Sequence, residues 1–98
     1  MTIGALCRLI PRPGAEEELM TRILDVAQDV RGEPGNVMTL VLRDPGRRGD
    51  VLMFELFRDE AAIEAHRVAE HSLAKGPAVH ALLESPMQVQ WLELASPE

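Results

Sequence analysis

The fold is decided by residues 51–66, whose sequence is VLMFELFRDEAAIEAH. Residues 51–57 are apolar at every position except Glu55, which predicts a strand that is buried on both of its faces. Asp59 then caps a helix, and Glu60 lies in its first turn, where the helix dipole favours an acid. The inward stripe of this helix is predicted to contain Ala62, Ile63 and His66.

Before this stretch, the sequence predicts a strand, a helix and another strand. Residues 36–44 form a strand that is again apolar on both faces, and a Pro/Gly hairpin loop at 44–50 joins it to the stretch above. The helix begins with three glutamates at 16–18 and ends at Gly32. Residues 3–10 form the first strand of the chain. The apolar stripe of the helix contains Leu19, Ile23, Val26, Ala27 and Val30.

After this stretch, the chain is expected to loosen at 68–72. Gly76-Pro77 then begins a helix over 78–83, because proline suits the first helical position. Residues 87–94 form the fourth strand. The resulting order is β-α-β-β-α-β, the α+β ferredoxin-like pattern, in which both helices lie on one face of a four-stranded antiparallel sheet.

This arrangement leaves the other face of the sheet bare. Several strands are apolar on both faces, and a soluble monomer does not tolerate an exposed apolar face of that size. We therefore expect a homodimer in which two sheets pack face to face, with the fourth strand reaching across. The small size of the chain favours the same conclusion, since a domain this small has a marginal core of its own.

Composition bounds the remaining possibilities. With 98 residues, we expect one domain over residues 1–98. The formal net charge of −6 argues against nucleic acid or an anionic membrane as a partner. No apolar run is long enough to span a membrane, and the first residues do not resemble a signal peptide. Cys7 is the only cysteine, which excludes an internal disulfide and fits a reducing cytoplasm.

Several short motifs resemble the antibiotic biosynthesis monooxygenase (ABM) family of dimeric α+β barrels. They are Pro13-Gly14-Ala15-Glu16-Glu17-Glu18, Glu33-Pro34-Gly35, Leu42-Arg43-Asp44-Pro45, residues 54–62 (FELFRDEAA), Ala65-His66 and Glu70-His71. The resemblance implies a ferredoxin-like subunit, a dimer, and a pocket between the helices and the sheet of each subunit. It also implies activity on quinols, polyphenols or related small aromatics with O2 and with no metal or organic cofactor.

The chain departs from the haem-degrading branch of this family. The resemblance implies that members of that branch carry an asparagine on the first strand, a tryptophan on the middle helix and a later histidine. Cys7 stands where the asparagine would be and His66 where the tryptophan would be, while His80 could match the late histidine. Haem degradation is therefore the weakest hypothesis. The chain also has no tyrosine, so a phenol donor is excluded.

Histidines are the leading catalytic candidates, because imidazole exchanges protons near neutral pH. His66 would take a proton from a substrate hydroxyl, or else it is a packing residue between helix and sheet. His71 would line the mouth of the pocket, or else anchor the segment after the helix. The two are five residues apart, which on a continuous helix separates them by about 140°, so they do not form a chelating pair. We predict no metal site, and note that one would require a bend between the two histidines.

Glu55 is the third catalytic candidate, since a carboxylate in an apolar strand must be paired or neutralised. It would be an acid/base group with a raised pKa, or else the structural partner of Arg43 or Arg58. Residues expected to contact a substrate are mostly large apolar groups suited to a flat ring, although Cys7 would more simply be an inert core residue. The predicted substrate-binding set is Trp91, Phe54, Met53, Cys7 and Arg43.

The leading hypothesis is a cofactor-independent monooxygenase that acts on a small quinol, phenolic or polyketide-like aromatic substrate with O2. His66 would assist deprotonation, and Glu55 or His71 would orient the substrate. The alternative is a non-catalytic dimeric module of the same fold that binds a small hydrophobic ligand or a partner protein. The two are distinguished by whether a pocket lined by His66 or a filled core lies between helices and sheet.

Overall fold

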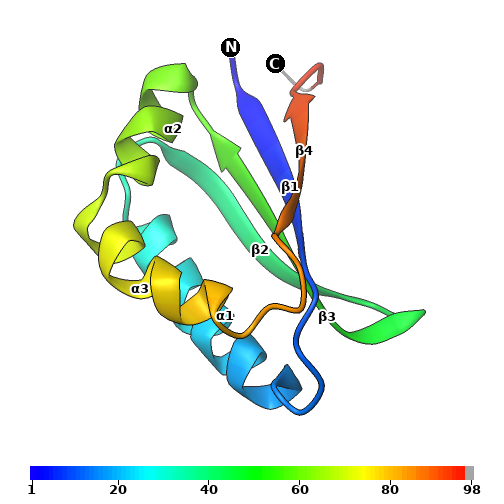
Figure 1. Cartoon of the computed structure of the whole chain (residues 1–98). Helices are drawn as coiled ribbons and strands as arrows, with labels where there is room; N and C mark the ends of the chain where they lie inside the picture. The colour runs from blue at the N-terminus through cyan, green and yellow to red at the C-terminus, as the bar shows by residue number, and fades with distance from the viewer. Residues whose placement is uncertain (97–98) are drawn as a thin grey trace.

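The chain forms a four-stranded sheet with three helices, in a computed structural model that describes residues 1–96 (Figure 1). The strands lie in the order β2-β3-β1-β4, and every neighbouring pair is antiparallel. All the helices lie on one face of the sheet, which confirms the ferredoxin-like arrangement. Along the chain the elements are β1 (Ile3–Leu9), α1 (Glu16–Arg31), β2 (Asn36–Asp44), β3 (Arg47–Phe57), α2 (Glu60–Arg67), α3 (Glu70–His80) and β4 (Gln88–Glu93).

The hairpin between β2 and β3 is tighter than predicted. The loop expected at 44–50 is wrong, because β3 already begins at Arg47, which pairs with Asp44 across the turn. The Asp44 Oδ1 atom accepts a hydrogen bond from the Gly46 N–H at 2.9 Å, a local contact that closes the turn. Arg8 on β1 also donates to the Asp44 carboxylate at 2.9 Å and ties the hairpin to the sheet.

The last helix is longer than predicted. A helix confined to 78–83 is wrong, because α3 starts at Glu70 and continues through Gly76 and Pro77. Proline inside a helix removes the backbone hydrogen bond to the carbonyl four residues earlier, here that of Leu73, yet α3 continues to His80. The connection between β3 and β4 therefore contains two helices, α2 and α3. Among residues 1–96, no helix is long and apolar enough to cross a membrane.

The core lies between the helices and the sheet. The apolar stripe of α1 faces it, and Leu19, Ala27 and Val30 are completely buried. On β1 and β3 alternate residues point toward the helices, as expected for strands with a period of two. The main core cluster contains Ala5, Cys7, Leu9, Leu19, Ile23, Ala27, Val51, Met53, Val79 and Leu83.

The opposite face of the sheet is apolar and open to solvent. Leu40, Phe54 and Leu6 lie side by side across β2, β3 and β1, at positions that alternate with the core-facing residues. Leu40 lies on the edge strand β2 and keeps 42% of its surface exposed. The further large apolar residues on this face that stay exposed are Met38, Leu42 and Leu92.

Candidate functional site

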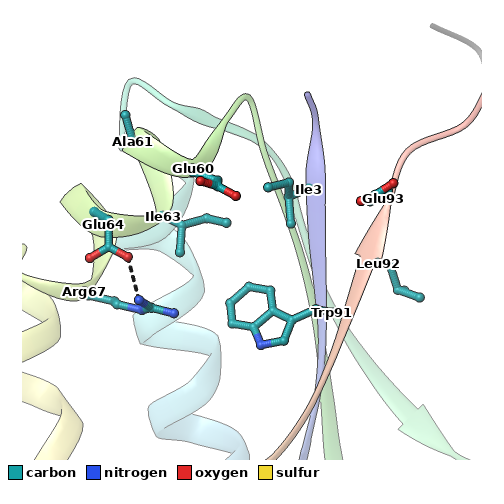
Figure 2. A pocket seen from close by; sticks show the side chains of 9 residues that line it. All are labelled: Ile3, Glu60, Ala61, Ile63, Glu64, Arg67, Trp91, Leu92 and Glu93. Atoms are coloured by element: carbon teal, nitrogen blue, oxygen red, sulfur yellow. Dashed lines mark hydrogen bonds and ion pairs between the residues drawn. The ribbon is translucent and has the colours of Figure 1, made fainter.

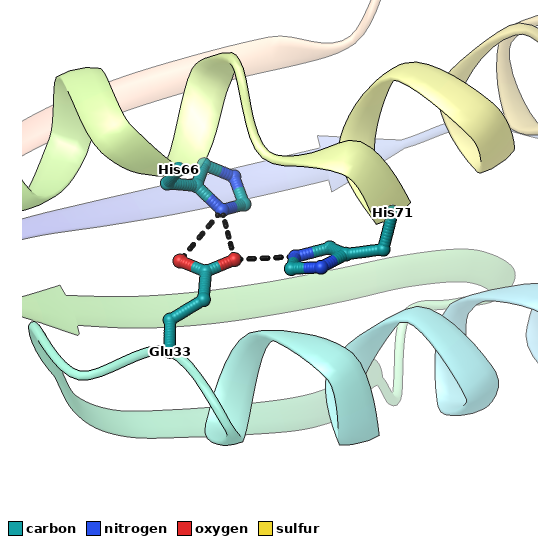
Figure 3. Close-up of side chains that lie close together, drawn as sticks. All are labelled: Glu33, His66 and His71. Atoms are coloured by element: carbon teal, nitrogen blue, oxygen red, sulfur yellow. Dashed lines mark hydrogen bonds and ion pairs between the residues drawn. The ribbon is translucent and has the colours of Figure 1, made fainter.

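Three side chains that are distant in sequence converge on the helical side of the sheet: Glu33, His66 and His71 (Figure 3). The Nδ1 atom of His66 lies 3.1 Å and 2.9 Å from the two carboxylate oxygens of Glu33. The Nε2 atom of His71 lies 2.5 Å from Glu33 Oε2. A carboxylate accepts hydrogen bonds, so both imidazoles donate to Glu33. Each of the three residues is partly buried.

Glu33 is brought to this position by the turn that follows α1. The helix ends at Arg31, and Gly35 then packs directly against α2, because a Cβ atom at Gly35 would lie 2.2 Å from the Cβ of Ala62. Asp59 fixes the start of α2 as predicted, since its Oδ1 atom accepts the Ala62 N–H at 2.9 Å. The close approach of turn and helix places the Glu33 carboxylate beneath His66.

His71 joins the cluster because the chain bends between α2 and α3. The first of these helices ends at Arg67 and the second begins at Glu70, so the two histidines do not share a continuous helix. The Ser72 hydroxyl donates to the His66 carbonyl at 2.7 Å and holds the bend. The condition stated above for the two histidines to meet is therefore fulfilled.

Glu55 lies on β3, on the far side of the His66 ring from Glu33. Its Oε2 atom is 3.7 Å from His66 Nε2 and, among residues 1–96, has no hydrogen-bond partner. Burial raises the pKa of Glu55, with the charge of Glu33 adding to the rise and the charge of His66 opposing it. Neither arginine considered above is its partner, since Arg43 donates to a backbone carbonyl and Arg58 lies beside Asp59.

The four groups form a row of alternating acid and base in the order His71, Glu33, His66 and Glu55. His71 and His66 keep about a quarter of their side-chain surface, whereas Glu33 and Glu55 keep 11% and 9%. The Phe57 ring packs beside His66 at 5.2 Å between centroids. Because Glu33 holds Nδ1, the His66 ring is oriented with Nε2 toward the sheet, and a proton accepted there would be stabilised by two carboxylates.

Two residues of the predicted substrate-binding set lie on the same sheet face as Glu55, but in the core. Met53 and Cys7 are cross-strand neighbours, and each is at most 5% exposed. Burial, and secondarily the charge of Glu55, raises the pKa of Cys7 to about 12. The thiol is therefore protonated at neutral pH and behaves as a small apolar group.

Trp91 faces a separate cavity between α2 and β4 (Figure 2). This cavity has a volume of about 580 Å³, and its apolar lining includes Ile3 and Ile63. The Arg67 guanidinium lies 5.8 Å from the centre of the Trp91 ring.

Phe54 is not part of either site, because it points to the open face of the sheet. Arg43 is outside the cluster as well, four residues beyond the β2 position that pairs with Glu55.

Glu33 is the residue that the sequence analysis missed. It belongs to the Glu33-Pro34-Gly35 stretch that carries part of the family resemblance, yet nothing in its spacing relates it to His66, 33 positions away. An acid in a Pro/Gly turn is ordinarily solvated. The sequence feature that could have pointed to Glu33 is the pair of small residues Gly35 and Ala62, whose contact brings the turn against α2.

Comparison with known proteins agrees with this architecture. The family model described as "Antibiotic biosynthesis monooxygenase" matches residues 2–75. The Bacillus subtilis protein named "Putative monooxygenase YcnE" is 30% identical over 87 residues, covering 86% of this chain and 88% of that protein. The Mycobacterium tuberculosis protein named "Putative monooxygenase Rv0793" is 28% identical over 87 residues, covering 89% and 85%.

Solved structures show the same fold. The structure of Rv0793 from Mycobacterium tuberculosis superimposes with a TM-score of 0.92 at 25% identity and covers 100% of both chains. A Nitrosomonas europaea structure described as "Putative antibiotic biosynthesis monooxygenase" has a TM-score of 0.92 at 14% identity, covering 98% of this chain and 92% of that one. With the sequence match over residues 2–75, these similarities establish that the chain belongs to the antibiotic biosynthesis monooxygenase family.

Proposed function

We propose that this protein is a cofactor-independent monooxygenase that uses O2 on a small quinol, phenolic or polyketide-like aromatic substrate. The observation that carries the proposal is the orientation of His66. Its Nδ1 atom is held by Glu33 at 2.9 Å, which leaves Nε2 as the atom that can accept a proton from a substrate. A carboxylate behind the base also stabilises the imidazolium that forms, as in other acid–histidine pairs.

The chemistry needs only a base and a site without bulk water. Nε2 of His66 removes a proton from the hydroxyl of an enol-type substrate, and the conjugated anion donates electrons to O2 at a ring carbon that bears one hydrogen. The carbon–oxygen bond forms a hydroperoxide, which loses water to leave a carbonyl. One oxygen atom stays on the substrate and the other leaves with the two hydrogens, so no external reductant is consumed.

The cavity beside Trp91 is the proposed place for the aromatic ring. The expected lining of this cavity by His66 is not seen, but Ile63 lines it and lies three residues before His66, nearly one turn of α2 away. A flat substrate stacked on the Trp91 ring would therefore extend along α2 toward the base. The Arg67 guanidinium beside Trp91 would favour an electron-rich ring in this cavity.

Oxygen uptake tests the proposal. Metal-free, EDTA-treated protein is given a panel of anthrones, quinols and polyphenols, and the wild type is compared with His66→Ala, His66→Gln and the matched control His80→Ala. We expect His66 replacement to lower kcat/KM by about 10²–10⁴-fold, the usual contribution of a general base. His80→Ala, at an exposed site on α3, should retain full activity.

Two outcomes contradict the proposal. Equal activity of wild type and both His66 variants removes His66 from the reaction. A wild type that consumes no oxygen with any member of the panel overturns the enzymatic assignment and favours the non-catalytic ligand-binding module.

We also propose that the open face of the sheet is the contact surface of a homodimer. The row Leu40, Phe54 and Leu6 supplies a continuous apolar centre, and Leu40 alone leaves 42% of its surface in water in the single chain. Pairing two such faces removes this surface from solvent. Light scattering coupled to size exclusion should give twice the mass of one chain at micromolar concentration, and a monomer would contradict the proposal.

A further inference from the structure

We propose that Glu33, His66 and His71 form a binding site for one divalent transition-metal ion per chain. The site follows from the juxtaposition of one carboxylate and two imidazoles from three different segments (Figure 3). It goes beyond the proposed oxygenase activity, which needs no metal. Binding of the ion can be measured whether or not the protein turns over a substrate.

The donor atoms are close enough to share an ion. One ligand atom from each residue lies within 4.8 Å of the other two. Bonds of about 2.0–2.2 Å to Zn²⁺ require donor atoms about 3.0–3.5 Å apart. Glu33 is 2.9 Å from His66 and 2.5 Å from His71, so small side-chain rotations would open the triangle to the size of an ion. Each ring would bind the metal through the nitrogen that now faces Glu33, with its proton moved to the opposite ring nitrogen.

Glu55 supplies the outer support that metal-bound histidines ordinarily have. When Nδ1 of His66 binds the ion, Nε2 carries the proton and needs an acceptor. Glu55 Oε2 lies 3.7 Å from Nε2, is buried, and has no other hydrogen-bond partner among residues 1–96. Shortening this separation to the usual 2.9 Å of an N–H···O bond would complete a carboxylate–histidine–metal chain. The site therefore accounts for an otherwise unsatisfied buried oxygen.

The site is also reachable from solvent. Glu33 and His71 line a cavity of about 650 Å³ between the end of α1 and the starts of α2 and α3. Small side chains, including Gly32, Ala65 and Ala69, border the same cavity and leave room for an incoming hydrated ion. Three protein ligands with solvent beside them would leave at least one coordination position for water.

The ligand chemistry narrows the choice of ion. Two imidazole nitrogens and one carboxylate oxygen suit Zn²⁺, Co²⁺, Ni²⁺ and Fe²⁺. Mg²⁺ and Ca²⁺ prefer sites made of oxygen ligands and should bind weakly here.

Binding of a metal ion at this site also has a consequence for His66. With Nδ1 on the metal and Nε2–H donating to Glu55, the ring has no free lone pair to accept a proton, so metal binding and base catalysis exclude each other.

The test is calorimetric titration of tag-free, EDTA-treated protein with Zn²⁺ and, separately, with Mg²⁺. We expect one Zn²⁺ per chain and no comparable Mg²⁺ binding. His71→Ala and Glu33→Gln should each weaken Zn²⁺ binding by at least about 100-fold, and Glu55→Gln by about tenfold, the range measured for outer-shell partners. His80→Ala is the matched control and should bind as the wild type does.

A second measurement uses the wild-type protein alone and needs no variant. The chain contains three histidines, so the ring protons of the wild type can be followed individually by NMR during titration with paramagnetic Co²⁺. Broadening of His66 and His71 with His80 unaffected supports the site. Equal broadening of all three, absence of Zn²⁺ binding at millimolar concentration, or equal affinity of His71→Ala and His80→Ala would overturn the proposal.

Discussion

Replacing Gly35 by alanine should disrupt the cluster without touching any of its members. Gly35 lies in the turn that carries Glu33, and its missing side chain is what allows this turn to approach α2. An added Cβ would lie 2.2 Å from the Cβ of Ala62 and 3.2 Å from its Cα. Gly35 does not have a positive φ angle, so the cost of the substitution is steric overlap and not backbone strain.

The magnitude follows from these distances. Carbon atoms pack favourably at about 3.5–4.0 Å, so turn and helix must separate by more than about 1 Å. The contact between Glu33 and His66, now 2.9 Å, would then exceed hydrogen-bonding distance. Overpacking of this kind costs about 1–3 kcal/mol of the free energy of unfolding. For a domain of this size, that loss lowers Tm by about 5–20 °C.

Thermal unfolding followed by circular dichroism, at one fixed protein concentration, measures the effect. Gly76→Ala is the matched control: apart from its chain neighbours and the backbone of α3, nothing lies within 4 Å of its Cβ position. Alanine there should change the free energy of unfolding by less than about 1 kcal/mol, because its helix preference is opposed by the following Pro77, which disfavours a helical conformation in a residue with a Cβ. Gly35→Ala with the Tm of the wild type and an unchanged His66 NMR signal would refute the reasoning about the turn.

Three further substitutions or probes test other parts of the structure. Since burial raises the pKa of Cys7 to about 12, the native thiol should resist DTNB at neutral pH and react fully in guanidinium. Stability should also fall as pH rises above the ordinary thiol value of 9.0, because the unfolded thiol ionises first; rapid native labelling would contradict this burial. Thr39→Val should raise the free energy of unfolding by about 1 kcal/mol in urea titration, because the buried Thr39 hydroxyl has no partner among residues 1–96. A loss of stability would show that the hydroxyl is bonded. Leu40→Glu should shift the protein to monomer in light scattering, whereas Leu24→Glu, at an exposed site on α1, should leave the mass unchanged. Equal masses for the two variants would rule out the open face as the dimer contact.

The elements that the sequence predicted well are those specified by local pattern. The stripe along α1 has helical period, Asp59 caps α2 with its own side chain, and the strand segments 37–42 and 51–57 are apolar except for Thr39 and Glu55. The two errors involve Pro/Gly segments. Residues 44–50 close in a tight turn, and α3 continues through Gly76-Pro77, because neighbouring contacts outweigh the local preference of these residues.

The candidate site was only half predictable. His66, His71 and Glu55 stood out because a titratable group in an apolar segment calls for a partner. Their true partner, Glu33, has no such local signature. Trp91 and Phe54 could not be assigned to a face from sequence, since a strand that is apolar on both sides gives no indication of which side meets the helices.

The order of strands and helices, and the presence of apolar residues on both sheet faces, are written in the chain because periodicity and capping act over a few residues. The meeting of Glu33 with His66 and His71 is different in kind. These contacts span 33 and 38 residues and depend on how closely Gly35 approaches Ala62 and where the chain bends after α2. Only packing between distant segments sets such distances, and so only the tertiary structure could show an acid between two histidines.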